Sequence, residues 1–256
     1  MNTSPATVDH LVVLAASLDQ GVAWCEATLG VTPGPGGEHP LMGTHNRLLS
    51  IATASHRRAY LEIIAVNPDE GLGGSAFCAG QGGARAAGGG HGAERTAAQT
   101  RHRWFDMDDP VLQARVAQHG PRLIHWVAGV ANIHAACARL ATHGIDRGPV
   151  LRASRQTPAG LLEWQITVRD DGQRLFDGCL PTLIQWDGTH PVDAMPASGV
   201  TLHRLGVRHP QAAALRAAWQ AIGLAEAGAG GIAIDEGDAQ LTATLQTPKG
   251  LIEITT

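Results

Sequence analysis

The chain repeats one order of secondary-structure signals three times, and this repetition limits its fold more than any other feature. In each copy a short apolar strand contains a histidine, a helix follows, and a glycine ends that helix. The histidine precedes the glycine by 20, 19 and 20 residues in the pairs His10 and Gly30, His125 and Gly144, and His203 and Gly223. Such regular spacing is typical of proteins assembled from copies of one unit.

The first copy predicts a strand, a helix and three further strands. Alternating apolar residues indicate the first strand at 8–14, and Ser17 with Gln20 has the spacing of a helix capping box. Gly30 ends the helix in the left-handed conformation that glycine tolerates. Glycine and proline predict turns at 33–37, and the three later strands are expected at 39–42, 47–52 and 60–66.

The second and third copies repeat this order. In the second, a strand at 123–127 leads to a helix that Asn132 begins and Gly144 ends. Its later strands are expected at 149–154, 161–168 and 181–186. The third copy predicts a strand at 200–207, a helix with Pro210 near its first turn and Gly223 as its end, and strands at 240–245 and 251–255.

Each copy is therefore a βαβββ unit, which predicts an α+β fold. One unit alone leaves sheet edges and a sheet face uncovered, so two units are expected to pair. Paired units would curl a mixed sheet of about eight strands into a cup. The predicted boundaries are 1–67 for unit one, 68–120 for an insert, 121–190 for unit two and 191–256 for the third, βαβββ-like unit.

The insert has two parts. Residues 71–92 contain too much glycine to pack alone, which predicts a surface loop or a lid over a site. Asp109 and Pro110 then begin a short helix that Gly120 ends. We expect this helix to lie as a strap across the outer face of the sheet.

Composition excludes several classes of protein. The formal net charge is −4, Lys249 is the only lysine, and the arginines are scattered among acidic residues, which argues against binding of nucleic acid. No apolar run approaches the roughly 20 residues that span a bilayer, so we expect a soluble, cytoplasmic protein. The four dispersed cysteines, Cys25, Cys78, Cys137 and Cys179, indicate reduced thiols.

Paired units would bring together side chains suited to a divalent metal ion. His10 and His125 occupy equivalent first strands, and Glu62 sits inside the apolar strand YLEIIAV, where a carboxylate needs a partner. Gln185 in LPTLIQW takes the place in unit two that Glu62 has in unit one. The candidate ligands are thus His10, Glu62, His125 and Gln185, although a histidine in a strand is often only a hydrogen-bonded structural residue.

Other residues are candidates for the walls and the base of such a site. Tryptophans on strands of unit two predict aromatic walls, unless they pack beneath helices instead: Trp126, Trp164 and Trp186. The segment around 39–47 offers polar groups for a substrate: His39, His45, Asn46 and Arg47. Glu62 or Glu163 is the candidate catalytic base.

Several segments resemble the vicinal oxygen chelate superfamily. VDHLVV and YLEII begin and end unit one, and GGEHPLMGTHNRLLSI, YLEIIAVNP, RWFDMDDPVLQAR, RLIHWV and QTPAGLLEWQIT resemble the glyoxalase-like domain proteins over about residues 6–190. The resemblance implies a cupped sheet with one divalent metal ion (Zn, Ni, Mn or Fe) at its floor. That ion would be held by His10 and His125 from first strands and by Glu62 and Gln185 from closing strands.

The sequence also departs from glyoxalase I. There a ligating glutamine lies on a first strand, whereas Gln185 lies on a closing strand, and the second ligating glutamate is missing here. Glu163 in LLEWQIT is the candidate to replace it, although it lies one strand early.

Three functions remain open. The first is a metal-dependent lyase or isomerase acting on a small molecule with neighbouring oxygens. The second is an iron(II) ring-cleaving dioxygenase, although the order of ligands differs, and the third is a metal-free binding protein of the bleomycin-resistance type. Because the third unit lacks a partner, we also expect a homodimer, with His203 and Glu253 as candidates for a second site.

Overall fold

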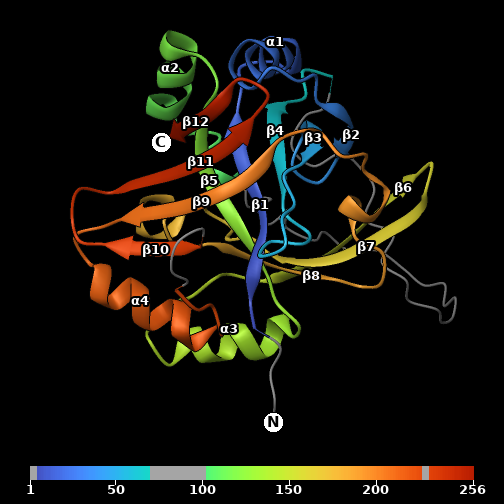
Figure 1. The fold of residues 1–256 in the computed structure, drawn as a ribbon. Helices are drawn as coiled ribbons and strands as arrows, with labels where there is room; N and C mark the ends of the chain where they lie inside the picture. Colours follow the sequence, from blue (N-terminus) through green and yellow to red (C-terminus); the bar gives the residue numbers. More distant parts are fainter. Residues whose placement is uncertain (1–4, 70–101, 227–230) are drawn as a thin grey trace, which may run out of the picture.

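The computed structural model describes residues 5–69, 102–226 and 231–256, and these form two β-sheets with four α-helices (Figure 1). The glycine-rich segment predicted as a loop or lid at 71–92, and Cys78 within it, lie outside the described residues. In the described part of the chain, no helix is long and apolar enough to cross a membrane.

The larger sheet contains eight described strands in the order β2-β3-β4-β1-β5-β8-β7-β6. Their bounds are β1 Thr7–Leu14, β2 Gly34–His39, β3 Thr44–Ser50, β4 Tyr60–Val66, β5 Arg122–Gly129, β6 Val150–Thr157, β7 Gly160–Thr167 and β8 Thr182–Trp186. The first strands of units one and two, β1 and β5, pair antiparallel at the centre, and each pairs in parallel with the closing strand of its own unit. The predicted α+β fold with paired βαβββ units is confirmed.

The smaller sheet has the order β10-β9-β11-β12 among the described strands. Its bounds are β9 Thr201–Arg208, β10 Ile232–Asp235, β11 Gln240–Thr247 and β12 Gly250–Thr255. Together with a helix it repeats the βαβββ order, with β10 as a strand that the sequence pattern did not predict.

The described helices are α1 Leu18–Leu29, α2 Pro110–His119, α3 Ile133–Ala141 and α4 Ala212–Ala221. They begin near the predicted signals, and α1 and α2 also end at theirs, whereas α3 ends before Gly144 and α4 before Gly223. The side chain of Ser17 accepts from the backbone N–H of Gln20, and Gly30 adopts a φ of 78° at the end of α1. Asn132 and Asp109 cap α3 and α2 in the same way.

The convex face of the larger sheet carries the main apolar core. Residues of α1, α3 and α4 and of the smaller sheet pack there against outward-facing side chains such as Leu11, Leu61 and Trp126. In Figure 1 the orange and red strands of the smaller sheet cross β1 and β5. The third unit therefore covers the convex face of its own chain.

A second apolar cluster lies on the concave face. Leu112 and Val116 of α2 belong to it, together with Trp104 and Phe105 of the short 3-10 helix η1 (Trp104–Asp106). The expectation that α2 straps the outer face is therefore wrong, because its apolar side meets inward-facing residues such as Val12.

Unit one departs from the predicted strand positions near its glycines. The segment expected as turns at 33–37 is most of β2, and β3 begins at Thr44. Gly36 explains the difference, since a Cβ there would lie only 2.1 Å from the backbone oxygen of Asn46. The glycines at this point permit the close approach of β2 to β3, so they do not form a turn.

A candidate acid–base site on the concave face

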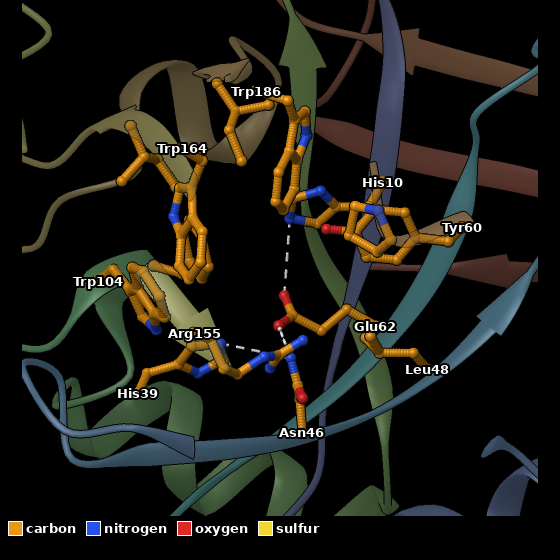
Figure 2. Close-up of a pocket in the computed structure, with 14 residues that line it drawn as sticks. His10, His39, Asn46, Leu48, Tyr60, Glu62, Trp104, Arg155, Trp164 and Trp186 are labelled. Atoms are coloured by element: carbon orange, nitrogen blue, oxygen red, sulfur yellow. Dashed lines mark hydrogen bonds and ion pairs between the residues drawn. The ribbon is translucent and has the colours of Figure 1, made fainter. Parts of the chain in front are cut away.

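A pocket lies on the concave side of the larger sheet (Figure 2). Its polar side chains are His10, His39, Asn46, Glu62 and Arg155. Its aromatic walls are Tyr60, Trp104, Phe105, Trp164 and Trp186. These residues share the concave face because every second residue of a strand points to the same side of the sheet.

Asp9 holds His10 in one orientation. The Nδ1 atom of His10 lies 2.7 Å from Oδ1 of Asp9, while Nε1 of Trp186 and Nε2 of His190 contact Oδ2 at 3.0 and 3.1 Å. Burial opposes ionisation of Asp9, but the hydrogen bonds from His10 and His190 outweigh it and lower its pKa to about 2. Because a carboxylate can only accept, Nδ1 of His10 carries the hydrogen, and its Nε2 is directed to the pocket.

Glu62 faces His10 from the neighbouring strand β4. Its Oε2 lies 3.7 Å from Nε2 of His10, and both side chains are buried. Its Oε1 accepts from Nδ2 of Asn46 at 2.6 Å. In turn, Oδ1 of Asn46 accepts from the backbone N–H of Gly37 at 2.7 Å, which fixes the amide and hence the carboxylate.

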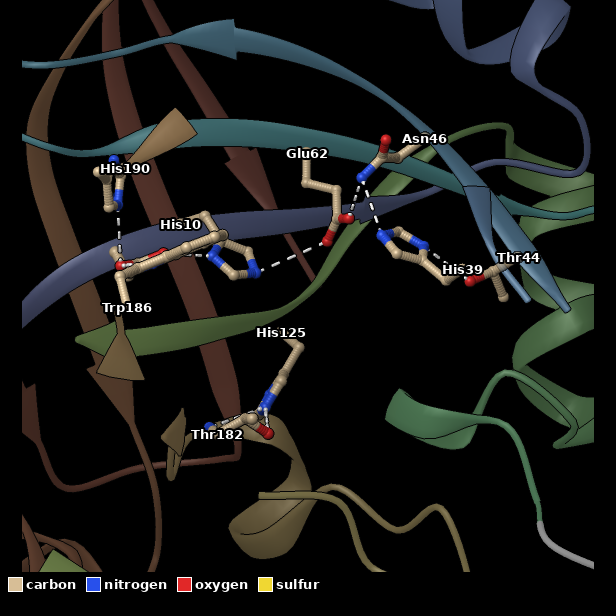
Figure 3. Close-up of polar contacts among 10 residues, drawn as sticks. His10, His39, Thr44, Asn46, Glu62, His125, Thr182, Trp186 and His190 are labelled. Carbon is tan, nitrogen blue, oxygen red and sulfur yellow. Dashed lines mark hydrogen bonds and ion pairs between the residues drawn. The ribbon is translucent and has the colours of Figure 1, made fainter. Parts of the chain in front are cut away.

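His39 completes a continuous row of polar contacts along the pocket (Figure 3). Its Nε2 lies 3.4 Å from Nδ2 of Asn46, and its Nδ1 lies 3.1 Å from Oγ1 of Thr44. Burial and the positive charge of Arg155 lower the pKa of His39 to about 3. His39 is therefore a neutral hydrogen-bonding residue here.

Tyr60 supports His10 from one side. The two rings stack with centroids 4.5 Å apart. Burial, and then the negative charges of Asp9 and Glu62, raise the pKa of the phenol, so that Tyr60 remains neutral. The pocket thus presents one imidazole and one carboxylate that face each other, both held by neighbouring side chains.

His125 occupies the position in unit two that His10 occupies in unit one, but its surroundings differ. His10 pairs with Val127 and His125 pairs with Val12 in the β1–β5 ladder, which makes the two histidines equivalent. His125 donates from Nδ1 to the backbone oxygen of Gly178 at 3.0 Å, and its Nε2 accepts from the backbone N–H of Thr182 at 3.2 Å. Both ring nitrogens are thus engaged away from the pocket.

His125 also differs from His10 in having positively charged side chains beside it. Nη2 of Arg147 donates to Oγ1 of Thr182 at 2.8 Å. Burial, followed by the charges of Arg147 and Arg174, lowers the pKa of His125 well below its ordinary value. A cation placed here would meet the guanidinium of Arg147.

Thr182 is the residue of unit two that corresponds to Glu62. Val12 lies opposite Glu62 in the β1–β4 ladder, and its counterpart Val127 lies opposite Thr182 in the β5–β8 ladder. Glu62 and Thr182 are also the third residues of matching segments, YLE in unit one and LPT in unit two. Gln185 is therefore not the counterpart of Glu62, because it lies three residues after Thr182.

Gln185 and Glu163 point away from the pocket. Oε1 of Gln185 accepts from the backbone N–H of Ile133, the first residue of α3. Glu163 is exposed on β7, whose inward-facing side chains are Trp164 and Ile166. Neither side chain comes near His10 and Glu62, because each lies on the other face of its strand from the pocket residues.

The predicted pocket walls divide between the two faces. Trp164, Trp186, His39 and Asn46 line the pocket. Trp126 lies on the convex side, donates to the backbone oxygen of Cys179 and packs against Trp219 of α4. His45 and Arg47 alternate with Asn46 on β3, so their side chains face away from it.

The metal ion that the resemblance implies needs its four ligands around one point. Of its four predicted ligands the structure brings together His10 and Glu62, and it does not bring His125 or Gln185 to them. Within residues 5–69, 102–226 and 231–256, no three histidine, cysteine, aspartate or glutamate side chains form a group suited to a metal ion. The residues present do not fit the four-ligand centre.

Sequence reasoning also missed residues that complete the site. Asp9 directly precedes His10, and an acid next to a strand histidine was the available signal. Arg155 gave no signal, because its place in the pocket depends on the pairing of β6 at the far end of the sheet. His190 reaches Asp9 from the segment that links units two and three, just before the short 3-10 helix η3 (Pro191–Ala194).

A solved structure with a TM-score above 0.5 supports the fold. A hypothetical protein from Staphylococcus aureus is similar at 14% identity, over 98% of this chain and 85% of that chain, with a TM-score of 0.51. Methylmalonyl-CoA epimerase from Mycobacterium tuberculosis matches at 15% identity, over 76% of this chain and 96% of its own, with a TM-score of 0.37. A search of curated proteins found no match.

Membership of a family rests on the sequence match. The glyoxalase-like domain family matches residues 8–223, which is most of the chain. The paired βαβββ units and the cupped eight-stranded sheet agree with that match. The chain belongs to the glyoxalase-like domain family.

Proposed function

We propose that the protein is an enzyme of the lyase or isomerase type that moves a proton on a small molecule with neighbouring oxygens. The facing pair His10 and Glu62 is the single observation that carries this proposal. Asp9 keeps the hydrogen of His10 on Nδ1, so Nε2 is the atom that meets the substrate. Asn46 fixes Glu62, which preorganises the second group.

The chemistry needs no residue outside this pair. One group takes a proton from a carbon next to a carbonyl, and the C–H electron pair becomes the C=C bond of an enolate while the carbonyl electrons move to oxygen. The other group donates a proton to that oxygen, which gives an enediol when the first carbon carries a hydroxyl. The first group then returns its proton to the neighbouring carbon while the second takes one from the other oxygen, so that the substrate is isomerised and both groups regain their starting states. His125 and Gln185 take no part, because they do not join the pair.

The aromatic walls favour one alternative, a protein that sequesters its ligand. Tyr60, Trp104 and Trp164 offer large flat surfaces for an unsaturated molecule, and binding alone would need nothing more. The iron(II) alternative requires two histidines with one carboxylate, and in the described part of the chain Glu62 meets only His10 in that way.

Proton exchange with solvent tests the proposal. The protein is incubated in D₂O with pyruvate, 2-oxobutyrate, phenylpyruvate and dihydroxyacetone, and loss of the C–H signal next to the carbonyl is followed by proton NMR. We expect exchange above the protein-free rate for at least one compound. His10→Asn and Glu62→Gln should each slow it by roughly 100-fold or more, the usual scale for removal of a general acid or base.

The control variant is Glu38→Gln, which removes an exposed carboxylate from β2 and should leave the exchange rate unchanged. Tight binding of a compound with no exchange across the whole set would contradict the proposal and support sequestration. Loss of exchange on treatment with EDTA, restored by a divalent metal, would also contradict it, because it would assign the chemistry to a metal ion.

A further inference from the structure

Arg155 brings a positive charge to the pocket, and no described side chain pairs with that charge. It belongs to β6 and lies beside His39 and Asn46 (Figure 2). Its Nε atom is buried without a hydrogen-bond partner, and no described residue forms a hydrogen bond or an ion pair with its guanidinium. A sheltered cation without an anion is costly, so the site favours a negatively charged ligand.

The charge of Arg155 acts on the pocket itself. After burial, it is the largest cause of the low pKa of His39, and it acts on Tyr60 as well. Both side chains line the same pocket, which places the guanidinium charge inside it. The described acids of the pocket region, Asp9 and Glu62, are engaged with His10, His190, Trp186 and Asn46 instead.

Trp104 supplies a second donor without an acceptor. Its side chain is 8% exposed, it lines the pocket, and its Nε1 atom is buried without a hydrogen-bond partner. The neighbouring Phe105 adopts a left-handed φ of 61°, a costly conformation for a non-glycine residue that holds Trp104 and Phe105 stacked toward the concave face. Two unused donors thus belong to side chains that line one pocket.

Gly37 leaves the room in which Arg155 lies. A Cβ at Gly37 would be 2.4 Å from Nη1 and 2.8 Å from Cζ of Arg155. Gly37 is on β2 and Arg155 on β6, the two edge strands of the larger sheet, so the arginine reaches from one edge to the other. A bulkier residue at 37 would displace the guanidinium.

We propose that Arg155 and the Nε1 atom of Trp104 form a carboxylate-binding subsite. A guanidinium matches the two oxygens of a carboxylate, and the indole N–H adds a third donor. A singly charged carboxylate suits a pocket that also contains Glu62 better than a doubly charged phosphate does, because like charges repel. The aromatic walls suit a planar body attached to the carboxylate.

This subsite rests on the proposed function and narrows its substrate class. The substrate is a small carboxylic acid with a planar, unsaturated body, whose carboxylate lies on Arg155 while its neighbouring oxygenated carbon faces His10 and Glu62. The residues that bind the carboxylate and the residues that move the proton are different, so the two proposals can be tested separately.

Calorimetric titration with benzoate tests the subsite, with benzamide as the neutral molecule of the same shape and inorganic phosphate as the other anion. We expect benzoate to bind at least tenfold more tightly than benzamide and phosphate. Arg155→Gln should weaken benzoate at least tenfold, and Trp104→Phe, which keeps the ring and removes the N–H, should weaken it about threefold. Arg152→Gln, an exposed arginine on the same strand, is the matched control and should have no effect.

Equal binding of benzoate and benzamide by the unaltered protein would overturn the subsite, and this comparison holds even if Arg155→Gln does not fold. Unchanged benzoate binding by folded Arg155→Gln would overturn it too, and tighter binding of phosphate would assign the site to phosphate instead. His10→Asn should retain benzoate binding within about threefold, since His10 is not among the donors. Failure of proton exchange with benzoate binding intact would therefore reject the proposed reaction and leave the subsite standing.

Discussion

Two histidines at equivalent positions in the paired units differ in what surrounds them. His10 contacts the carboxylates of Asp9 and Glu62, whereas His125 contacts the backbone of Gly178 and Thr182. Threonine in place of glutamate in the closing strand of unit two, with Arg147 beside it, makes the second position a structural hydrogen-bond centre. Only unit one supplies an acid–base pair, so the pseudo-symmetry of the sheet does not extend to its chemistry.

The stability of the protein should depend on pH through His125. Its side chain is fully buried and its folded-state pKa lies well below 6.5, while in the unfolded chain it takes up a proton near pH 6.5. Below that pH the unfolded chain binds more protons, so the free energy of unfolding falls as the pH falls. The expected slope from this one residue is roughly 1 kcal/mol per pH unit below pH 6.

Urea unfolding at pH 7, 6 and 5 measures this slope. His125→Asn should flatten it, and His119→Asn, at an exposed position in the last turn of α2, should leave it unchanged. An unaltered slope in His125→Asn would contradict the assignment of His125 as a neutral buried residue.

Single helices and strands could be predicted well where the signal is local. Ser17, Asn132 and Gly30 bound their helices as expected, because capping depends on side chains within one turn. The face on which α2 packs and the presence of β2 were not predictable in this way. Both depend on which distant strands come together, and glycine that permits a close approach has the same sequence signature as glycine in a turn.

The packing of α1 on β4 gives a prediction at this scale. A Cβ at Gly21 would lie 2.4 Å from Cγ2 of Ile63, a fully buried side chain with little freedom to move. Alanine would favour the helix by up to about 1 kcal/mol, but the overlap costs about 1–3 kcal/mol or more. We expect Gly21→Ala to lower the free energy of unfolding by about 1–2 kcal/mol in urea unfolding, and a gain in stability would contradict the packing.

At the scale of the whole molecule, the third unit closes the convex face of the paired sheet. Its helix and strands share the apolar core of units one and two, and Nζ of Lys249 donates to the backbone oxygens of Glu26 and Ala27 near the end of α1. This covering removes the reason for expecting a homodimer, and the homodimer itself stays a prediction. His203 and Glu253 are exposed on the smaller sheet and do not line the concave pocket.

This arrangement explains why the sequence indicated the site only in part. The repeat predicted that first and closing strands would meet, and so it found His10 and Glu62. It could not place Arg155 or Trp104, because their positions depend on the approach of the sheet edges and on the path of the segment around η1. The residues that we assign to proton transfer were thus predictable, and those that we assign to the carboxylate were not.

A crystal structure with benzoylformate, a planar 2-oxo acid that has no exchangeable C–H next to its carbonyl, tests the central claim most directly. We predict its carboxylate at about 3 Å from the guanidinium of Arg155, with its keto carbon facing Nε2 of His10 and the carboxylate of Glu62. A ligand bound elsewhere on the protein, or bound in this pocket with its keto group turned away from His10, would contradict the account.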